Sequence, residues 1–297
     1  MKVAVVGTGR MGSAMAHAIA RGGADLTVYN RTPDPARALA DELGASVAGS
    51  AAEAAAGAEV AITMLADGEA VRATWDGPDG LVAGAHPGGV LVDMSTVPPD
   101  TLAPFEAAVR ERGSGILDAP VSGSTVLAES GQLTIMAGGT ADDLERARPA
   151  LDLVSRGITH VGPLGSGAAL KLAVNALIFA INNSLSEALV LAERAGIDRG
   201  VAYDVFVGSA AGAPFVGYKR DAFVRPDAIP VAFSIDLALK DLRLITDLAE
   251  RLGVPVPQSL VNQEILEEAS VRLGGERDAS AVAVHLRERA KEGALGR

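Results

Sequence analysis

Short apolar runs alternate with longer helical patterns over about the first 160 residues of the chain. The apolar runs have the length and composition of buried strands. A parallel strand needs a crossover before the next one, so strands that alternate with helices predict βαβ units and a mostly parallel, doubly wound sheet. The predicted strands cover residues 2–6, 26–30, 60–65, 90–94, 115–119, 133–137 and 158–161, and the first predicted helices cover 11–21 and 35–43.

The pattern changes at residues 162–167, where the strand signals stop and the rest of the chain becomes nearly all helical. We therefore expect an α/β domain over 1–164 and an all-helical domain over 165–297. Neither proline nor glycine occurs from Ala168 to Ala195, which predicts one helix roughly 40 Å long. Its residues are largely apolar, so we expect other elements to cover it. Further helices are predicted over 199–207, 235–252 and 258–273, and from 280 onward.

Length and charge limit the classes of function. A chain of 297 residues is typical of about two domains. Hydrophobic residues make up 48% and charged residues 21%, as in an ordinary globular protein. The net charge of −11 and the scattered basic residues provide no positive field for a phosphate backbone, so nucleic acid is not an expected partner.

Redox chemistry in this chain would need a dissociable cofactor, because the sequence contains no cysteine. The four histidines, His17, His86, His160 and His285, do not have the spacing of metal ligands, so no metal is expected. The first residues run directly into a strand without the pattern of a signal peptide, which predicts a cytoplasmic protein. Polar residues interrupt the most apolar stretch, 176–192, so no membrane span is expected either.

A glycine turn follows the first predicted strand and opens the first predicted helix. It has the pattern G-x-G-x-x-G, in which the first glycine permits the tight turn, the second lets a pyrophosphate approach the backbone and the third allows close packing. Amide groups at the helix N-terminus favour a phosphate anion. The turn therefore predicts dinucleotide binding by Gly7, Thr8, Gly9, Arg10, Met11 and Gly12.

The end of the second predicted strand carries no acidic residue. Asn30 stands where a carboxylate would bind a ribose and repel a 2′-phosphate, and Arg31 and Thr32 add donors. This favours NADP over NAD. Met64 and Leu65, at the end of the third predicted strand, are further candidates for cofactor binding.

Lys171 lies near the start of the long, otherwise apolar helix, and Asn175 lies four residues further on the same face. A lysine on a buried surface is costly unless it is paired or neutral, and such sites can shift a pKa into a catalytic range. The alternative is a lysine that extends to the solvent from a helix end. The residues alone leave both interpretations open.

Five segments together resemble the β-hydroxyacid dehydrogenase family, which includes 3-hydroxyisobutyrate dehydrogenase and glyoxylate/succinic semialdehyde reductase. They are the glycine turn, Asp93-Met94-Ser95-Thr96, the stretch from Asp118-Ala119-Pro120-Val121-Ser122-Gly123-Ser124 to Met136, the run from Gly165 to Asn175, and Lys240-Asp241-Leu242-Arg243. The resemblance extends from about residue 2 to 285, and the order of the segments is more specific than any single motif.

The resemblance implies roles for individual residues. Lys171 would be the general acid or base, and Asn175 would orient it or the substrate. Ser122 and Gly123 would hold the substrate carboxylate, with Thr96 near both the nicotinamide and the substrate. At position 124, many family members have glycine, whereas the glyoxylate/succinic semialdehyde reductase branch has serine as here.

The same resemblance implies that Lys240 and Asp241, in the second domain, border the cofactor and the active site, with Phe233 as an aromatic neighbour of the substrate. A structural role for the Lys-Asp pair on a solvated helix face is the alternative.

The expectation from the sequence is thus an NADP(H)-dependent oxidoreductase acting on a small carboxylic acid, with a site between the domains and assembly as a homodimer or higher oligomer. Imine reductases share the build and the Asn-Arg-Thr signature but generally lack the helix lysine. 6-Phosphogluconate dehydrogenase is much longer. A non-enzymatic NADP-binding scaffold protein could dispense with Lys171, which this chain retains.

Overall fold

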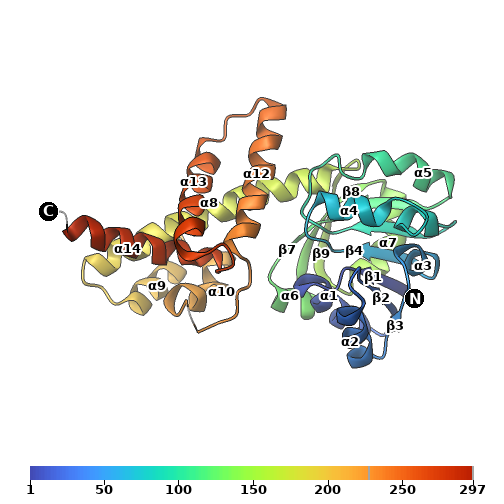
Figure 1. Cartoon of the computed structure of the whole chain (residues 1–297), viewed down its shortest axis with the longest axis horizontal. Coiled ribbons are helices and arrows are strands. Elements are labelled where there is room, and N and C mark those ends of the chain that lie inside the picture. Colours follow the sequence, from blue (N-terminus) through green and yellow to red (C-terminus); the bar gives the residue numbers. More distant parts are fainter. Residues whose placement is uncertain (227, 296–297) are drawn as a thin grey trace. The chain divides into compact units, whose positions relative to one another are not determined.

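The computed structural model describes residues 1–226 and 228–295. The chain divides into two compact units, Met1–Lys171 and Leu172–Arg297. The first is an α/β unit and the second is helical (Figure 1). The division lies inside a helix, seven residues after the boundary expected from the sequence.

Among the described residues, the first unit holds a nine-stranded sheet with the order β3-β2-β1-β4-β5-β6-β8-β7, and β9 pairs with β8. Strands β1 to β6 pair in parallel, whereas β8 runs antiparallel to β6 and β7. The strand order reverses between β1 and β4, and open α/β sheets bind ligands at such a switch point. The strands are β1 (Lys2–Val6), β2 (Asp25–Tyr29), β3 (Ser46–Val47), β4 (Val60–Thr63), β5 (Val90–Asp93), β6 (Gly115–Asp118), β7 (Val121–Ser122), β8 (Leu133–Gly139) and β9 (Ser155–Gly162).

Helices cover both faces of this sheet. Successive side chains of a strand point to opposite faces, so Val3 and Val5 of β1 pack with α1, α2 and α7, whereas Ala4 and Val6 pack with α3 and α4. This confirms the predicted doubly wound architecture. The helices are α1 (Arg10–Arg21), α2 (Pro33–Leu43), α3 (Ala51–Ala56), α4 (Gly68–Trp75), α5 (Glu106–Glu111), α6 (Thr125–Glu129) and α7 (Ala141–Leu151), with 3-10 turns at Leu81–Gly84 and Ala103–Phe105.

All seven predicted strands are present, but their ends differ. The second, third, fourth and fifth strands end one or two residues earlier than predicted, so Asn30, Met64 and Leu65 lie in the loops that follow. Strands β3 and β7 were not predicted, because each has two residues, which are too few to show an alternating pattern.

The second unit is helical, as predicted. Helix α8 begins in the first unit and supplies most of its 29 residues to the second. One core joins α8 to α12 and α13, and another joins the later part of α8 to α9, α10 and α11. The helices are α8 (Ser166–Arg194), α9 (Arg199–Gly208), α10 (Pro214–Tyr218), α11 (Arg220–Val224), α12 (Ile235–Leu252), α13 (Pro257–Leu273) and α14 (Val282–Leu295), with a 3-10 turn at Ala279–Ala281.

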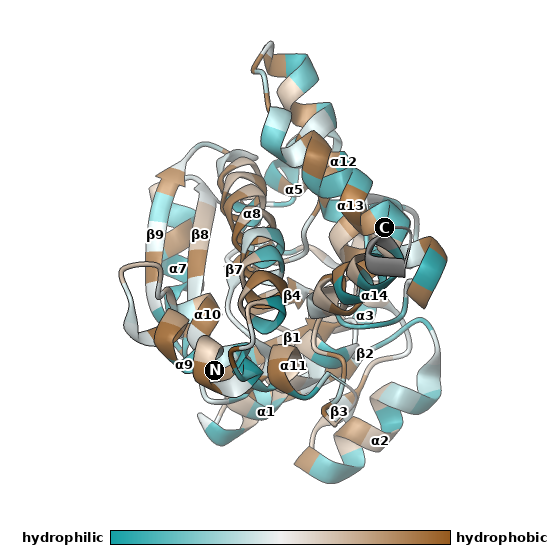
Figure 2. Cartoon of the chain, turned by 90° about the vertical axis from the view of Figure 1, so that its left-hand side faces the viewer, coloured by the Kyte–Doolittle hydropathy of each residue, from teal (hydrophilic) through white to brown (hydrophobic). Residues whose placement is uncertain are grey.

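Helix α8 is predominantly apolar, as its colouring in Figure 2 shows, and by length and composition alone it could cross a membrane. The expectation that polar residues exclude a span on composition was therefore too strong, although the core helix of a soluble protein passes the same test. Its buried amides have protein partners: Asn182 donates to the carbonyl of Ala279, and Asn183 donates to Oδ1 of Asn262.

The expectation that other elements cover α8 is confirmed only in part, because α8 packs on two cores but keeps exposed leucines. Leu170, Leu177 and Leu191 are 40%, 63% and 73% exposed. These three residues are separated by seven and fourteen positions, so they follow one stripe along the helix.

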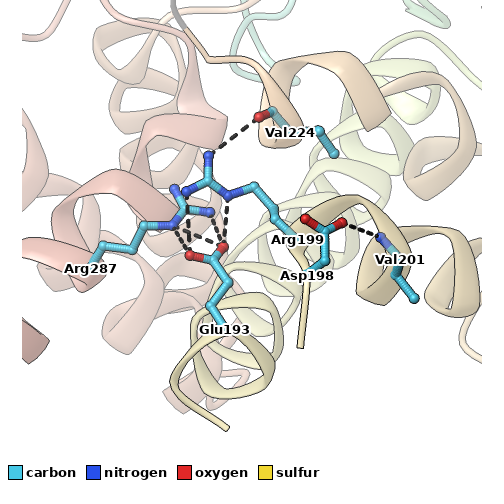
Figure 3. Close-up of polar contacts among 6 residues, drawn as sticks. All are labelled: Glu193, Asp198, Arg199, Val201, Val224 and Arg287. Atoms are coloured by element: carbon cyan, nitrogen blue, oxygen red, sulfur yellow. Dashed lines mark hydrogen bonds and ion pairs between the residues drawn. The ribbon is translucent and has the colours of Figure 1, made fainter. Parts of the chain in front are cut away.

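The C-terminal end of α8 is held by an ion cluster (Figure 3). Glu193 accepts from Nε of Arg199 at 2.9 Å and from Nε and Nη2 of Arg287 at 2.7 and 2.6 Å. Burial favours the neutral acid, but the two guanidinium groups outweigh it and hold the pKa of Glu193 below its ordinary value. One carboxylate thus ties α8 to the start of α9 and to α14.

Candidate active site

The glycine turn joins β1 to α1. Two of its three glycines are required because backbone atoms of this chain lie too close for a side chain. Gly7 has φ +101°, and a Cβ there would lie 2.4 Å from the carbonyl oxygen of Met64. A Cβ on Gly12 would lie 1.9 Å from the carbonyl oxygen of Gly7. These distances allow no side chain at either position.

Gly9 is different, because apart from its own chain neighbours no heavy atom of residues 1–226 and 228–295 lies within 4 Å of the place that its Cβ would take. Among the described residues, no side chain caps α1 with a hydrogen bond, and its first turn contains no acidic residue. The open backbone at Gly9 and the amides of the helix N-terminus fit the pyrophosphate of a dinucleotide.

Asn30 connects the glycine turn to the loop after β2. Its Oδ1 accepts from the backbone amide of Thr8 at 3.2 Å, and its Nδ2 donates to the carbonyl of Thr32 at 2.8 Å. The Asn30 side chain therefore links the glycine turn to the loop after β2 by hydrogen bonds. Arg31 and Thr32 are exposed beside it.

A buried polar network shapes the loop that holds Met64 and Leu65. Oδ1 of Asp93 accepts from the hydroxyls of Thr63 at 2.6 Å and Ser95 at 2.7 Å, and the Ser95 hydroxyl accepts from the amide of Leu65 at 2.9 Å. Burial raises the pKa of Asp93 to about 6, although both hydroxyls favour the ionised form. The network joins the loop after β4 to the loop after β5, where Thr96 lies.

Asp118 ends β6 and binds the start of α8. Its Oδ1 accepts from the amide of Gly165 and its Oδ2 from the amide of Ala168, each at 2.7 Å. Burial raises the pKa of Asp118 to about 6, while these backbone amides act in the opposite direction. Lys171 follows on the same helix, half-buried, three residues after Ala168.

The segment after Asp118 forms a short hairpin. Ser122 in β7 pairs with Thr134 in β8. Gly123 has φ +144°, and a Cβ there would lie 2.8 Å from Cδ2 of Leu133. Ser124 caps α6, because its hydroxyl accepts from the amide of Leu127 at 3.3 Å. Ser124 is thus the N-cap of this helix.

In the second unit the structure brings Asn175 and Asp241 together. Nδ2 of Asn175 donates to Oδ2 of Asp241 at 2.7 Å, and both residues are buried. Nζ of Lys240 lies 2.9 Å from the other oxygen, Oδ1. Asp241 therefore orients the Asn175 amide and carries an ion pair with a neighbour that is partly exposed.

Phe233 stacks on Phe179 of α8, with ring centroids 6.1 Å apart. Its backbone is also fixed, because its amide donates to Oδ2 of Asp278 at 3.2 Å. Asp278 in turn forms a buried ion pair with Lys219, whose Nζ lies 2.9 Å from both carboxylate oxygens.

The predicted residues thus form three groups: the glycine turn with Asn30, the ends of β4 to β6 with the start of α8, and the Asn175–Asp241–Lys240 cluster. The structure adds partners for which the sequence pattern indicated no role, above all Asp93 and Asp118. The available signal was a charged residue at the end of a fully apolar strand, which needs partners once it is buried.

Two family models match almost the whole chain. Residues 2–162 match the NAD binding domain of 6-phosphogluconate dehydrogenase, and residues 165–286 match the NAD-binding domain of NADP-dependent 3-hydroxyisobutyrate dehydrogenase.

Curated relatives are similar over nearly the full length. The chain is 34% identical to a 3-sulfolactaldehyde reductase of Escherichia coli over 96% of this chain and 95% of the relative. It is 33% identical to an NAD-dependent L-serine dehydrogenase of Pseudomonas aeruginosa, over 95% and 96%. It is 32% identical to glyoxylate/succinic semialdehyde reductase 2 of Arabidopsis thaliana, over 95% and 78%.

A solved structure has the same fold. A 3-hydroxyisobutyrate dehydrogenase from Salmonella typhimurium superposes with a TM-score of 0.86 at 29% identity, covering 96% of this chain and 99% of that one. Together with the family models, these similarities show that the chain belongs to the β-hydroxyacid dehydrogenase family, whose members use a nicotinamide cofactor.

Proposed function

We propose that the chain is an NADP(H)-dependent oxidoreductase that interconverts the carbonyl and alcohol forms of a small carboxylic acid, with Lys171 as the general acid or base. The observation that carries the proposal is the end of β6. There Asp118 holds the first turn of the helix that bears Lys171, and the same segment continues into Ser122 and Gly123. The end of β6 therefore fixes the start of the helix that carries the lysine and leads directly into the proposed substrate loop.

The glycine turn, Met64 and Leu65 would hold the dinucleotide, and Arg31 and Thr32 would donate to a 2′-phosphate. Thr96 and Lys240 would border the nicotinamide. The nicotinamide, when bound, supplies the hydride in reduction and accepts it in oxidation.

In reduction, the Lys171 ammonium donates a proton to the carbonyl oxygen while the carbonyl carbon gains the hydride, which gives the alcohol. In oxidation, the neutral amine takes the hydroxyl proton. Ser122 and Gly123 would fix the carboxylate, and Asn175, held by Asp241, would orient the lysine or the substrate. Phe233 would contribute an aromatic wall. Positioning of this kind can supply several kcal/mol of the barrier reduction.

The preferred substrates in this proposal are small aldehyde acids such as glyoxylate and succinic semialdehyde, followed by 3-hydroxyisobutyrate and related 3-hydroxy acids. The named relatives act on 3-sulfolactaldehyde, L-serine, and glyoxylate or succinic semialdehyde, which are also small and polar. We further propose that the protein is soluble, cytoplasmic and a homodimer or higher homo-oligomer.

The experiment is a panel of carbonyl acids, 3-hydroxy acids and cyclic imines, followed by the absorbance of NADPH and NADH. We expect turnover with aldehyde acids or 3-hydroxy acids that Lys171→Ala abolishes. Turnover of cyclic imines alone would replace this proposal with an imine reductase. Binding of NADPH without turnover of any substrate would favour a scaffold protein.

A further inference from the structure

We propose that Asp118 is the positioning residue for Lys171: its carboxylate fixes the first turn of α8 by accepting from the amides of Gly165 and Ala168. The catalytic consequence rests on the proposed function of Lys171, but the contact itself does not.

The contact has the geometry of a helix cap made from another element. Both oxygens of one carboxylate accept from backbone amides at 2.7 Å, and 47 and 50 residues separate the donors from Asp118. Asp118 is 3% exposed. The first amides of a helix lack partners within the helix, so a buried carboxylate at this end satisfies them and interacts favourably with the helix dipole.

The surrounding glycines leave room for this carboxylate. A Cβ on Gly138 would lie 2.3 Å from Oδ1 of Asp118, and a Cβ on Gly167 would lie 2.9 Å from Oδ2. Gly165 has φ +93°, which turns the chain so that its amide reaches the carboxylate. The run Gly165-Ser166-Gly167 is therefore built around Asp118.

The position of Lys171 depends on the position of this first turn of α8. It follows Ala168 by three residues, which is about 4.5 Å along the helix axis. A shift or fraying of the first turn would move the lysine directly. A misplacement of about 1 Å in a reacting group can cost on the order of 100-fold in rate.

The test compares Asp118→Asn with Asp143→Asn. The control replaces another buried carboxylate of the same unit, which pairs with Arg110 and Arg146 and is not part of the contact with α8. An asparagine at 118 keeps only one acceptor and places a donor against an amide. We expect kcat to fall by about 10-fold to 100-fold with the KM for NADPH nearly unchanged, and we expect kcat of the control to stay near wild type.

Hydrogen exchange resolved to single residues supplies a readout that needs no activity. In the wild type, the amides of Gly165 and Ala168 should be protected like those of the core strands, and Asp118→Asn should lose that protection while β1 keeps its own. Rapid exchange of these two amides in the wild type would overturn the proposal, whether or not the variant folds.

The proposed role of Lys171 and the contact of Asp118 with α8 can be tested separately. If Lys171→Ala retains full turnover, the proposed function is wrong, but the exchange result still decides the contact. If Asp118→Asn loses protection at the start of α8 yet keeps wild-type kcat, the contact is structural and Asp118 does not position Lys171. Ala168→Pro removes the donor that lies within the first turn of α8, and it should also lower kcat.

Discussion

Asp93 and Asp118 lie opposite each other as the last residues of the paired strands β5 and β6, and both carboxyl groups are buried. Desolvation is the largest cause of the raised pKa of each, and Asp118 raises the pKa of Asp93 further. Each carboxylate nevertheless fixes a loop by hydrogen bonds. Asp93 accepts from the Ser95 hydroxyl, which accepts from the amide of Leu65, and Asp118 accepts from the amide of Gly165 just before α8.

Asp93 should make the stability of the fold depend on pH. Its folded pKa of about 6 lies above the ordinary 3.8, so its contribution to the free energy of unfolding is fully present below the unfolded pKa and is lost as the pH rises through 6. When the pH rises from about 4 to about 7, we expect the free energy of unfolding of the wild type to fall by on the order of 2 kcal/mol more than that of Asp93→Asn.

Urea unfolding at a series of pH values measures this difference, with Asp79→Asn as a control at an exposed position. A stability difference between wild type and Asp93→Asn that stays constant across the range contradicts the prediction.

Replacement of Lys171 by alanine should remove the proton donor. We expect kcat to fall by about 100-fold or more, while the Kd for NADPH, measured by fluorescence titration, stays near wild type. Lys171→Arg should be nearly as inactive, because a guanidinium does not release its proton. Lys291→Ala, at an exposed position on α14, is the control. Equal losses of turnover and NADPH affinity would instead indicate a structural lysine.

Arg31 should discriminate between the two nicotinamide cofactors. A guanidinium can form charge-assisted hydrogen bonds with a 2′-phosphate, so Arg31→Ala should weaken NADPH binding much more than NADH binding. Calorimetric titration with both cofactors measures the two affinities. Arg37→Ala, on the exposed face of α2, should leave their ratio unchanged. If Arg31→Ala weakens both cofactors equally, the 2′-phosphate assignment fails.

The Glu193 cluster should stabilise the second unit in a pH-dependent way. Glu193→Gln removes the charge that binds Arg199 and Arg287, and we expect a loss of about 1–3 kcal/mol. Because the folded pKa of Glu193 is lowered, this stabilisation is present above its ordinary 4.5 and is lost as the pH falls through the folded value. Thermal unfolding at pH 7 and at acidic pH, with the exposed Glu187→Gln as control, measures it. A pH-independent difference argues against the ion pairs.

The exposed leucine stripe of α8 should be covered in a homo-oligomer. Large exposed apolar side chains that recur on one helix face are typical of an interaction site, and Leu177 is the central one of the three leucines. Light scattering after size exclusion should give at least twice the 30.1 kDa of one chain. Leu177→Glu should shift the protein toward the monomer, and Val271→Glu, an exposed change on α13, should not. A wild type that elutes as a monomer refutes the expectation.

The order and type of the elements could be predicted from local patterns. The pattern of a strand, a glycine turn and a helix around Gly7 to Gly12 is visible within a few residues of sequence, and so is the uninterrupted helical run that became α8. Periodicity is a local property, which is why it identified these elements and placed Lys171 and Asn175 on one helix. The resemblance of spaced motifs then pointed to the family.

The partners of the site residues were decided only by the tertiary structure. Asp118 meets Ala168 across 50 residues, and Asn175 meets Asp241 across 66. Such contacts depend on how strands and helices stack, so no local pattern could indicate them. The exposure of Leu177 could not be predicted from the sequence either. A sequence shows that a residue is apolar, but only the packed chain shows what covers it. A buried charge must find a partner, and the fold decides which one.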